Sequence, residues 1–334
     1  MLNIHETNRL KPFKQKTDNK MSKIKRSEIM TVYEFEPKKY YKAFGSYEPV
    51  LRIEDEDTVI TKTVDNAGRD LNDKQVASGP NPLTGPFYVE GAELGDVLAV
   101  QLNRLWPNRQ LGRSSTVIAP HVLEPRYISE FLQKEPRVTA EWRLDLEKGT
   151  ATLLSPETKI GQIVLPLNPL LGCIGVAPED GQSISSITSG QYGGNMDYNG
   201  FVSGVTVYFP VFTRGALFFV GDGHAVQGDG EIVGTGIEVS FDVQFTVNVI
   251  KNKTINWPRA ETQEFLITVG NACPLDQALQ IATTEMVRWL KEDYDLTDRS
   301  LHILLGQCIE YDIGNVFDPA YTVACKLKKK WLQK

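Results

Sequence analysis

Residues 221–231 read Gly-Asp-Gly-His-Ala-Val-Gln-Gly-Asp-Gly-Glu, which places one histidine, one glutamine, three carboxylates and four glycines within eleven residues. Apolar, strand-like runs flank this segment on both sides. Glycine weakens regular structure, and a carboxylate near a core is costly unless something pairs with it. A compact turn that aims several polar groups at one point is a common way for a rigid β scaffold to carry a site. We therefore expect the segment to be a loop that carries the chemistry.

The side chains of this segment suit a divalent cation. A histidine with carboxylates is a typical donor set for zinc, whereas all-oxygen donors suit calcium. The spacing is not that of an EF-hand loop. A single histidine in a turn is more often a hydrogen-bonded structural residue than a ligand, so both interpretations of His224 stay open at this point.

Nucleophilic catalysis has less support in the sequence. No Gly-x-Ser-x-Gly elbow is present, and Cys173 stands in the apolar stretch Leu-Gly-Cys-Ile-Gly without an adjacent base. The same stretch lacks the Gly-Lys-Ser/Thr ending that a triphosphate-binding loop needs. We therefore expect neither a cysteine nucleophile nor a nucleotide site.

Three further groups of polar residues stand beside glycine-rich turns. Asp65 ends a β-branched run, and a turn-rich stretch over residues 78–86 leads to Glu90. Residues 189–197 end in Asn195-Met196-Asp197. Glu238 directly follows the histidine-containing segment and begins the polar face of the next strand, so it is either a site carboxylate or a solvated strand residue.

The elements that must position these groups are mostly strands. From residue 237 to 249 every odd position is Ile, Val or Phe, and every even position from 238 to 248 is polar, which predicts a strand with one buried face. Similar signals predict strands at residues 58–64, 97–105, 205–211 and 216–220. Helical periodicity appears late, at about residues 275–290 and 298–308. The predicted fold class is β-rich α+β, with a β-sandwich or barrel-like core and a C-terminal helical layer.

Domain organisation follows from charge and from a weak internal echo. Residues 1–30 carry eight Lys/Arg against three Asp/Glu and are predicted to be a disordered basic tail. Residues 31–334 are predicted to be the catalytic domain. Residues 89–96 resemble residues 213–222, each with a Gly-Ala turn before a Gly-Asp pair, so the domain is either two intertwined β units or shows a chance likeness of two turns.

Composition excludes several partners. Outside the tail the chain carries 28 Lys/Arg against 39 Asp/Glu, a net charge of −11, which argues against a nucleic-acid surface. No apolar run approaches the ~18 residues that a membrane span needs, and no secretory segment follows the N-terminal charges. The four cysteines are far apart without a Cys-x-x-Cys pair, which indicates reduced thiols and a cytoplasmic location.

Three blocks of the sequence resemble the acetamidase/formamidase family of amide hydrolases. The first runs from Thr84-Gly85-Pro86 through Glu90-Gly91-Ala92 to Gly95-Asp96, and the second is Gly194-Asn195-Met196-Asp197. The third begins at Pro210 and includes residues 221–231. The blocks occur in the family's order over roughly residues 45–325. The sequence departs from the family around residues 101–121, where Gln101 and residues 106–120 are individual, which affects the expected substrate more than the expected reaction.

The resemblance implies hydrolysis of short linear amides, such as formamide or acetamide, to a carboxylate and ammonia without an organic cofactor. It also implies a homo-oligomer, either a dimer or a tetramer. Amides are poor electrophiles, so a catalyst needs an activated water, an oxyanion stabiliser and an acid for the leaving nitrogen. We expect a divalent metal, zinc or calcium, to lower the pKa of a bound water. The expected ligands are Asp65, Asp222, His224 and Glu238.

The remaining roles are distributed over residues near these ligands. We expect Glu90 to be the general base, and Asn195 or Gln227 to stabilise the oxyanion. Asp197, Asp229 and Glu231 are expected to orient these groups or to shape the loop. Two alternatives stay open: a catalytically silent β-sandwich relative that binds calcium or a small polar ligand, and an amidase for a bulkier amide whose pocket residues 106–120 shape.

Overall fold

The computed structural model describes residues 31–131 and 137–332. The basic tail expected over residues 1–30 lies outside the described residues. By contacts between Cα atoms, residues from Thr31 onward form one unit. The expected division of this unit into two intertwined β units stays a prediction.

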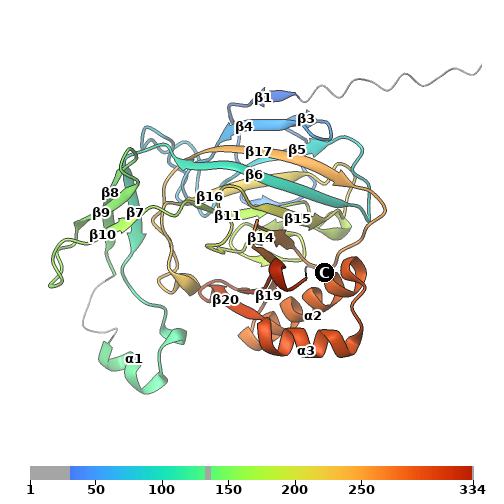
Figure 1. Cartoon of the computed structure of the whole chain (residues 1–334). Coiled ribbons are helices and arrows are strands. Elements are labelled where there is room, and N and C mark those ends of the chain that lie inside the picture. The colour runs from blue at the N-terminus through green and yellow to red at the C-terminus, as the bar shows by residue number, and fades with distance from the viewer. Residues whose placement is uncertain (1–30, 132–136, 333–334) are drawn as a thin grey trace, which may run out of the picture. The chain divides into compact units, whose positions relative to one another are not determined.

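Two large sheets contain most of the strands (Figure 1). The nine-stranded sheet consists, in spatial order, of β1 (Val32–Glu34), β4 (Thr58–Lys62), β17 (Phe241–Ile250), β6 (Val97–Pro107), β15 (Thr206–Pro210), β18 (Arg259–Glu261), β19 (Phe265–Ala272), β21 (Tyr321–Lys328) and β20 (Glu310–Asn315). The six-stranded sheet consists of β13 (Ser189–Gly190), β14 (Gly193–Asn195), β11 (Leu170–Gly175), β16 (Phe218–His224), β5 (Leu83–Val89) and β3 (Leu51–Ile53). Most neighbouring strands are antiparallel.

Aromatic side chains hold the two sheets face to face. The ring of Phe245 on β17 lies 5.2 Å from that of Phe87 on β5 and 5.0 Å from that of Phe218 on β16, measured between ring centroids. Alternation along β17 turns every second side chain into this core, since strand side chains point to opposite faces. The core is therefore a β-sandwich, which confirms the predicted β-rich fold class.

The helical layer covers the C-terminal end of the larger sheet. Helix α2 (Leu275–Tyr294) packs on β19 and β21 through Ala278, Ala282 and Met286, and α3 (Asp298–Cys308) follows it. The α2 backbone comes close enough for Thr268 Oγ1 to donate a hydrogen bond to the carbonyl of Ala282. Both helices lie where the periodicity of the sequence predicts them (Figure 1).

A four-stranded sheet lies outside the sandwich and was not expected from the sequence. Its order is β10 (Val164–Pro166), β9 (Thr150–Ser155), β8 (Thr139–Asp145) and β7 (Leu111–Ser115). Helix α1 (Pro125–Phe131) stands between β7 and β8 in the chain. The short elements are β2 (Ala43–Phe44), which pairs with β12 (Ile184–Ser185), and the 3₁₀ turns η1 (Pro120–Val122), η2 (Glu179–Gly181), η3 (Asp229–Glu231) and η4 (Lys329–Trp331).

The histidine-containing segment is only partly a loop, which corrects the prediction made from its glycines. Residues 221–224 continue β16 and pair with β11. Glycine is needed there for close packing, since a methyl group on Gly223 would overlap the ring of Phe241. Glu238 is also not on a wet face: it is buried and forms isolated β-bridges with Arg113 and His224.

Two smaller observations complete the comparison with the sequence. Among the cysteines, Cys173 and Cys325 are buried, Cys308 is partly buried and Cys273 is exposed, and all four are free thiols. No helix within the described residues is long and apolar enough to cross a membrane.

Candidate functional site

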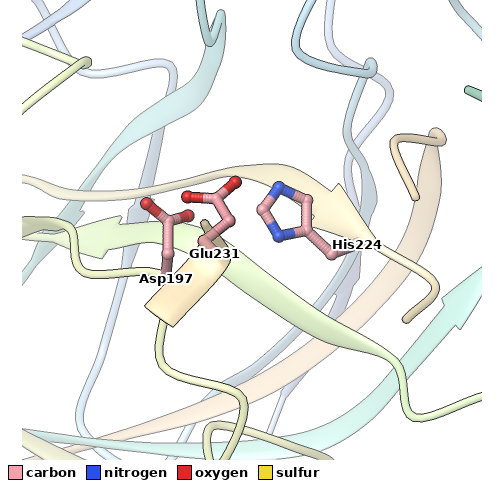
Figure 2. Close-up of side chains that lie close together, drawn as sticks. All are labelled: Asp197, His224 and Glu231. Atoms are coloured by element: carbon pink, nitrogen blue, oxygen red, sulfur yellow. The ribbon is translucent and has the colours of Figure 1, made fainter. Parts of the chain in front are cut away.

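Five ionisable residues that are far apart in the sequence meet in the interior. Asp222 and His224 lie at the end of β16, Glu238 lies opposite them, Asp197 follows β14, and Glu231 ends the turn η3. All five are buried, with at most 6% of the residue surface exposed. Figure 2 shows Asp197 and Glu231 reaching toward the ring of His224. We call this group, together with Asp318, the acid cluster.

The imidazole of His224 lies at the centre of the acid cluster. Its Nε2 is 3.0 Å from Glu238 Oε1 and 3.5 Å from Asp222 Oδ1. The ring nitrogen is not aligned with either oxygen for a hydrogen bond. Two triads share this histidine, Asp222–His224–Glu238 and Asp197–His224–Glu231, and the donor atoms of each triad lie within 4.8 Å of one another.

Gln227 fixes which nitrogen of His224 faces the carboxylates. The Nε2 amide group of Gln227 donates hydrogen bonds to the backbone carbonyls of Asp197 and Gly314, at 2.6 and 3.2 Å. Because carbonyl oxygens only accept, Oε1 of Gln227 must be the atom that lies 2.8 Å from His224 Nδ1. Nδ1 therefore carries a proton, and the exchangeable nitrogen, Nε2, points at the acids.

A second amide gathers the other carboxylates. Nδ2 of Asn315 lies 2.6 Å from Asp197 Oδ2, 2.8 Å from Glu231 Oε2 and 2.6 Å from Asp318 Oδ2. The acid cluster thus holds five carboxyl groups. Among the described residues, no Lys or Arg forms an ion pair with any of them.

This surplus of negative charge perturbs the acid–base properties of the group. Burial raises the pKa of Asp197 and of Glu231 well above the usual range, and neighbouring carboxylates raise both further. Burial raises the pKa of Glu238 to about 8, even though the charge on His224 lowers it. Burial opposes a charge on His224, but Glu238 and Asp222 outweigh it and raise its pKa well above the usual range. The five carboxyls cannot all be ionised unless a cation joins them.

The unsatisfied atoms of the cluster fit a divalent ion. Four buried polar atoms without a hydrogen-bond partner belong to it: Asp197 Oδ1, Asp222 Oδ1, His224 Nε2 and Glu238 Oε2. Buried polar groups are rarely left unpaired, so a group of four in one place indicates something that the protein atoms do not supply. Three carboxylate oxygens and one imidazole nitrogen are donors that zinc and similar ions accept.

The backbone also departs from its usual conformations here. Asp197, Asp222 and Glu231 have φ angles of 43°, 58° and 46°, in the left-handed region that residues other than glycine rarely adopt. Such strain clusters at functional sites, where the surroundings hold it in place. Gly172 on β11 provides the space beneath, because a methyl group there would overlap Asp197 Oδ1 and Asp222 Oδ2.

The structure brings Asp222, His224 and Glu238 together as expected, but two expected site residues lie elsewhere. Glu90 is at the end of β5 that is distant from the cluster, half-exposed and paired with Arg52 at 3.0 Å. The structure therefore does not bring Glu90 to the acid cluster, and its assignment as general base stays a prediction. Asp65 is buried, but Arg109 occupies its Oδ2 at 2.8 Å, and backbone N–H groups of the following turn occupy Oδ1. Both oxygens of Asp65 thus accept hydrogen bonds within the protein, Asp65 is in neither triad around His224, and its assignment as a metal ligand stays a prediction.

The amide side chains have positions other than those expected for an oxyanion site. Asn195 accepts a hydrogen bond from Asn81 at 3.1 Å and donates one to Asp318 at 2.6 Å, so both ends are used within the protein. Gln227 is likewise fully engaged. Asp229 is exposed and bonded to Asn199. Asp197, expected as a catalytic residue that orients other groups or shapes the loop, and Glu231, expected to orient other groups or to shape the loop, belong to the cluster itself.

Sequence reasoning missed three residues of this network. Asn81 donates to Asp222 Oδ2 at 3.1 Å as well as to Asn195. Asn315 ends β20 and Asp318 follows it, nearly a hundred residues after His224, with no glycine-rich motif to mark them. Tertiary contacts, such as the hydrogen bond from Val316 N–H to the carbonyl of Gly230 in η3, bring Asn315 and Asp318 to the site.

A cleft of about 880 Å³ opens beside the cluster, and Glu238 belongs to both. The backbone of Glu238 exchanges two hydrogen bonds with that of Arg113 on β7, of 3.1 and 2.7 Å, so the four-stranded sheet forms one wall. The lining residues are Asn66, Ala67, Arg69, Arg113, Ser114, Ser115, Arg137, Val138, Thr139, Glu141, Ser155, Gly234, Thr235, Glu238 and Phe317.

Fold and site define a strand-rich protein with a buried, acid-rich candidate metal centre at the end of a β-sandwich. The sequence profile of the Acetamidase/Formamidase family matches residues 180–318, which include all five carboxylates of the acid cluster and His224. The chain is similar to the crystal structure of an acetamidase from Yersinia enterocolitica, with a TM-score of 0.78, 32% identity, and coverage of 91% of this chain and 94% of the other. It is also similar to a recombinant predicted acetamidase/formamidase from Thermoanaerobacter tengcongensis, with a TM-score of 0.77, 30% identity, and coverage of 91% and 97%.

These likenesses over nearly the whole of both chains show that the chain belongs to the acetamidase/formamidase family. The acetamidase of Mycolicibacterium smegmatis is 26% identical over 222 residues, which cover 51% of this chain and 53% of that protein. The chain thus spans about half the length of the curated relatives it matches.

Proposed function

We propose that the chain hydrolyses the C–N bond of a linear carboxamide and releases a carboxylate and ammonia. Family membership supports this proposal, because relatives are named acetamidase and formamidase. The acid cluster supports it independently. Burial raises the pKa values of Asp197, Glu231 and Glu238, which is the property that proton transfer near neutral pH requires.

A divalent metal, zinc or calcium, is part of the proposal. Asp222, His224 and Glu238 would hold it, with Asp197 Oδ1 as a further donor. When bound, such an ion supplies a lower pKa for a coordinated water and polarises a carbonyl oxygen. Gln227 keeps Nε2 of His224 directed at the site, and Asn81 holds Asp222 in place through Oδ2.

Glu231 is proposed to carry a proton to the departing nitrogen. Hydrolysis needs such a carrier, because a free amide anion is a poor leaving group. Asn315 holds Oε2 of Glu231, which leaves Oε1 to exchange a proton. Burial raises the pKa of this carboxyl, so it retains a proton at a pH where an exposed glutamate has lost it.

The observation that carries the proposal is a set of four buried donor atoms without hydrogen-bond partners, one of which is His224 Nε2. It is tested by incubating the purified protein with formamide, acetamide and propionamide and measuring ammonia release. The metal content of the same preparation is measured by mass spectrometry before and after dialysis against a chelator. We expect ammonia release that is lost with the metal and restored by adding zinc or calcium.

Other outcomes separate the alternatives. Bound metal without ammonia release from any amide would favour a catalytically silent relative that uses the same donors to bind an ion or a small polar ligand. Ammonia release that survives complete removal of the metal would remove the metal from the proposal and leave the reaction. The cytoplasmic location and the homo-oligomeric state belong to the proposal as well, and light scattering during size-exclusion chromatography tests whether the protein is a dimer or a tetramer.

A further inference from the structure

The cleft beside Glu238 is far larger than a short amide requires. Formamide has three heavy atoms and acetamide has four, so each fills a volume on the order of 100 Å³, given ~30 Å³ for one water in the liquid. The cleft measures about 880 Å³, within the range of pockets that enclose molecules several times larger. The space therefore fits an amide with a substantial second part.

The lining of the cleft is basic, although the body of the protein is acidic. Arg69, Arg113 and Arg137 line it together with Glu141 and Glu238. One of the three guanidinium groups is neutralised: both oxygens of Asp73 lie 2.7 Å from the two terminal nitrogens of Arg113. This fork-to-fork geometry is that of a strong, structural ion pair.

The other two guanidinium groups keep open donors. Nη1 of Arg69 donates to the backbone carbonyl of Asp73 at 3.2 Å, and Nε of Arg137 donates to Ser115 Oγ at 3.3 Å. In the part of the chain that the structure describes, neither forms an ion pair with a carboxylate. A guanidinium has five N–H donors in a fixed plane, so most donors of both side chains are free to bind a planar anion.

The two free arginines come from different elements that line the cleft. Arg69 is in the turn after β4, which the buried Asp65–Arg109 pair holds in place. Arg137 directly precedes β8, whose partner β7 is bonded to the backbone of Glu238. The walls are thus anchored to the same framework as the acid cluster. A substrate that spans the cleft places one end near the acids and the other near the guanidinium groups.

We propose that the substrate is an amide that carries a carboxylate at its far end, which Arg69 and Arg137 bind while the amide group lies at Glu238. The inference rests on the proposed function and deepens it. An anionic substrate would be repelled by the five carboxyl groups, and two guanidinium groups at the cleft offset this repulsion. They also donate charge-assisted hydrogen bonds to the carboxylate, which a neutral amide of the same shape cannot accept.

The test compares two amides of equal shape and different charge, succinamic acid and 4-methylpentanamide. We expect kcat/KM of the wild-type protein to be at least ten times higher for the carboxylate-bearing amide, chiefly through a lower KM. This advantage should shrink as sodium chloride is raised from roughly 50 mM to 500 mM, since salt screens partly exposed charges. Comparable constants for the two amides at low salt would overturn the proposal and leave the proposed function standing.

Substitutions of the two arginines test whether they cause the preference for the carboxylate-bearing amide. Arg137→Gln, at an exposed position where folding is not at risk, should reduce the ratio of the two constants about tenfold, as loss of one charge-assisted contact predicts. Arg137→Lys should restore part of it, and Arg69→Gln combined with Arg137→Gln should abolish it. Arg299→Gln on α3 is the matched control. A ratio that survives the double substitution overturns the proposal, and failure of wild-type protein to hydrolyse any amide overturns both this inference and the proposed function.

Discussion

Two buried groups of charged residues in this protein are built on opposite principles. Under helix α2, Glu285 faces Arg259 of β18 at 2.8 Å, and Arg288 adds a second contact at 3.4 Å. Trp289 covers the guanidinium of Arg259 at 5.3 Å. In the acid cluster, five carboxyl groups share one imidazole and, among the described residues, no basic side chain pairs with them. The first group balances acid with base, although Arg259 Nη1 has no hydrogen-bond partner, whereas the second group holds a surplus of carboxyl groups.

The difference separates structural charge from functional charge. A buried ion pair with both partners present restrains the packing of a helix on a sheet and needs no proton or cation to balance its charge. A buried surplus of one sign is stable only when protons or a cation compensate it. Substitutions in the two regions should therefore fail in different ways, one in function and the other in folding.

The largest effect is expected at the centre of the acid cluster. His224→Ala removes the donor that both triads share, and we expect kcat/KM for the best amide to fall by a factor on the order of 10³. Bound metal should fall in parallel, while circular dichroism shows a folded protein. The matched control is His302→Ala, which changes an exposed histidine of α3. Full activity with unchanged metal content in His224→Ala would refute the proposal that the acid cluster is a metal centre.

In the structural ion pair, a substitution is expected to affect stability instead. Glu285→Leu leaves the guanidinium of Arg259 buried without its principal partner, so the free energy of unfolding should fall by about 3–5 kcal/mol. Urea denaturation measures this loss, and activity per folded molecule should stay close to that of the wild type. The double substitution Arg259→Met with Glu285→Leu removes both charges and should recover much of the stability. A single variant as stable as the wild type would show that the pair contributes nothing.

A smaller effect is expected one residue away from the donors. Gln227→Leu keeps His224 but removes the acceptor that fixes its Nδ1 proton, so zinc affinity should fall about 10- to 100-fold. Competition with a coloured chelator measures the affinity of the metal alone. Gln280→Leu on the exposed side of α2 serves as the control. Unchanged zinc affinity in Gln227→Leu would mean that the ring is held by its packing and not by the glutamine.

The smallest effect concerns the metal-free protein and pH. Folding raises the pKa of Glu238 from 4.5 to about 8, so between these values the folded protein binds more protons than the unfolded chain. Stability from this source is then present at low pH and is lost as the pH rises toward 8. Asp197 and Glu231, whose pKa values are also raised, act in the same direction. The melting temperature of chelated protein should fall between pH 5 and pH 8, and adding metal at pH 8 should restore it; a rise over this interval would contradict the surplus of charge.

Much of the fold could be predicted because its signals are local. Strict alternation from residue 237 to 249 identified the central strand, and the apolar period of residues 275–290 identified α2. The four-stranded sheet was not predicted, although β8 alternates between polar and apolar residues; its partners β7, β9 and β10 are shorter and do not show this alternation. The strand ending at His224 was taken for a loop because its glycines serve close packing against Phe241 and not a turn.

The site could be predicted only as far as one segment of sequence carries it. Asp222 and His224 share a strand and Glu238 lies directly across from it, so the motif and its neighbourhood were sufficient for these three. Glu90 and Asp65 stand in equally suggestive turns, but their partners, Arg52 and Arg109, come from other parts of the chain. Asn315 and Asp318 reach the site because the β20–β21 hairpin contacts the distant turn η3, where Val316 N–H donates to the carbonyl of Gly230, and no local pattern encodes this contact.

A substitution at Gly172 separates the identity of the donor residues from the positions of their donor atoms. Its φ angle lies outside the left-handed region, so alanine can adopt the same backbone, and yet the added methyl group would occupy the space between Asp197 and Asp222. Gly172→Ala would thus retain every donor residue of the acid cluster, but Asp197 Oδ1 and Asp222 Oδ2 would have to move away from the added methyl group. The variant has the same net charge and the same donor residues as the wild type. Any loss of activity or of metal affinity in this variant measures how much the positions of these donors matter.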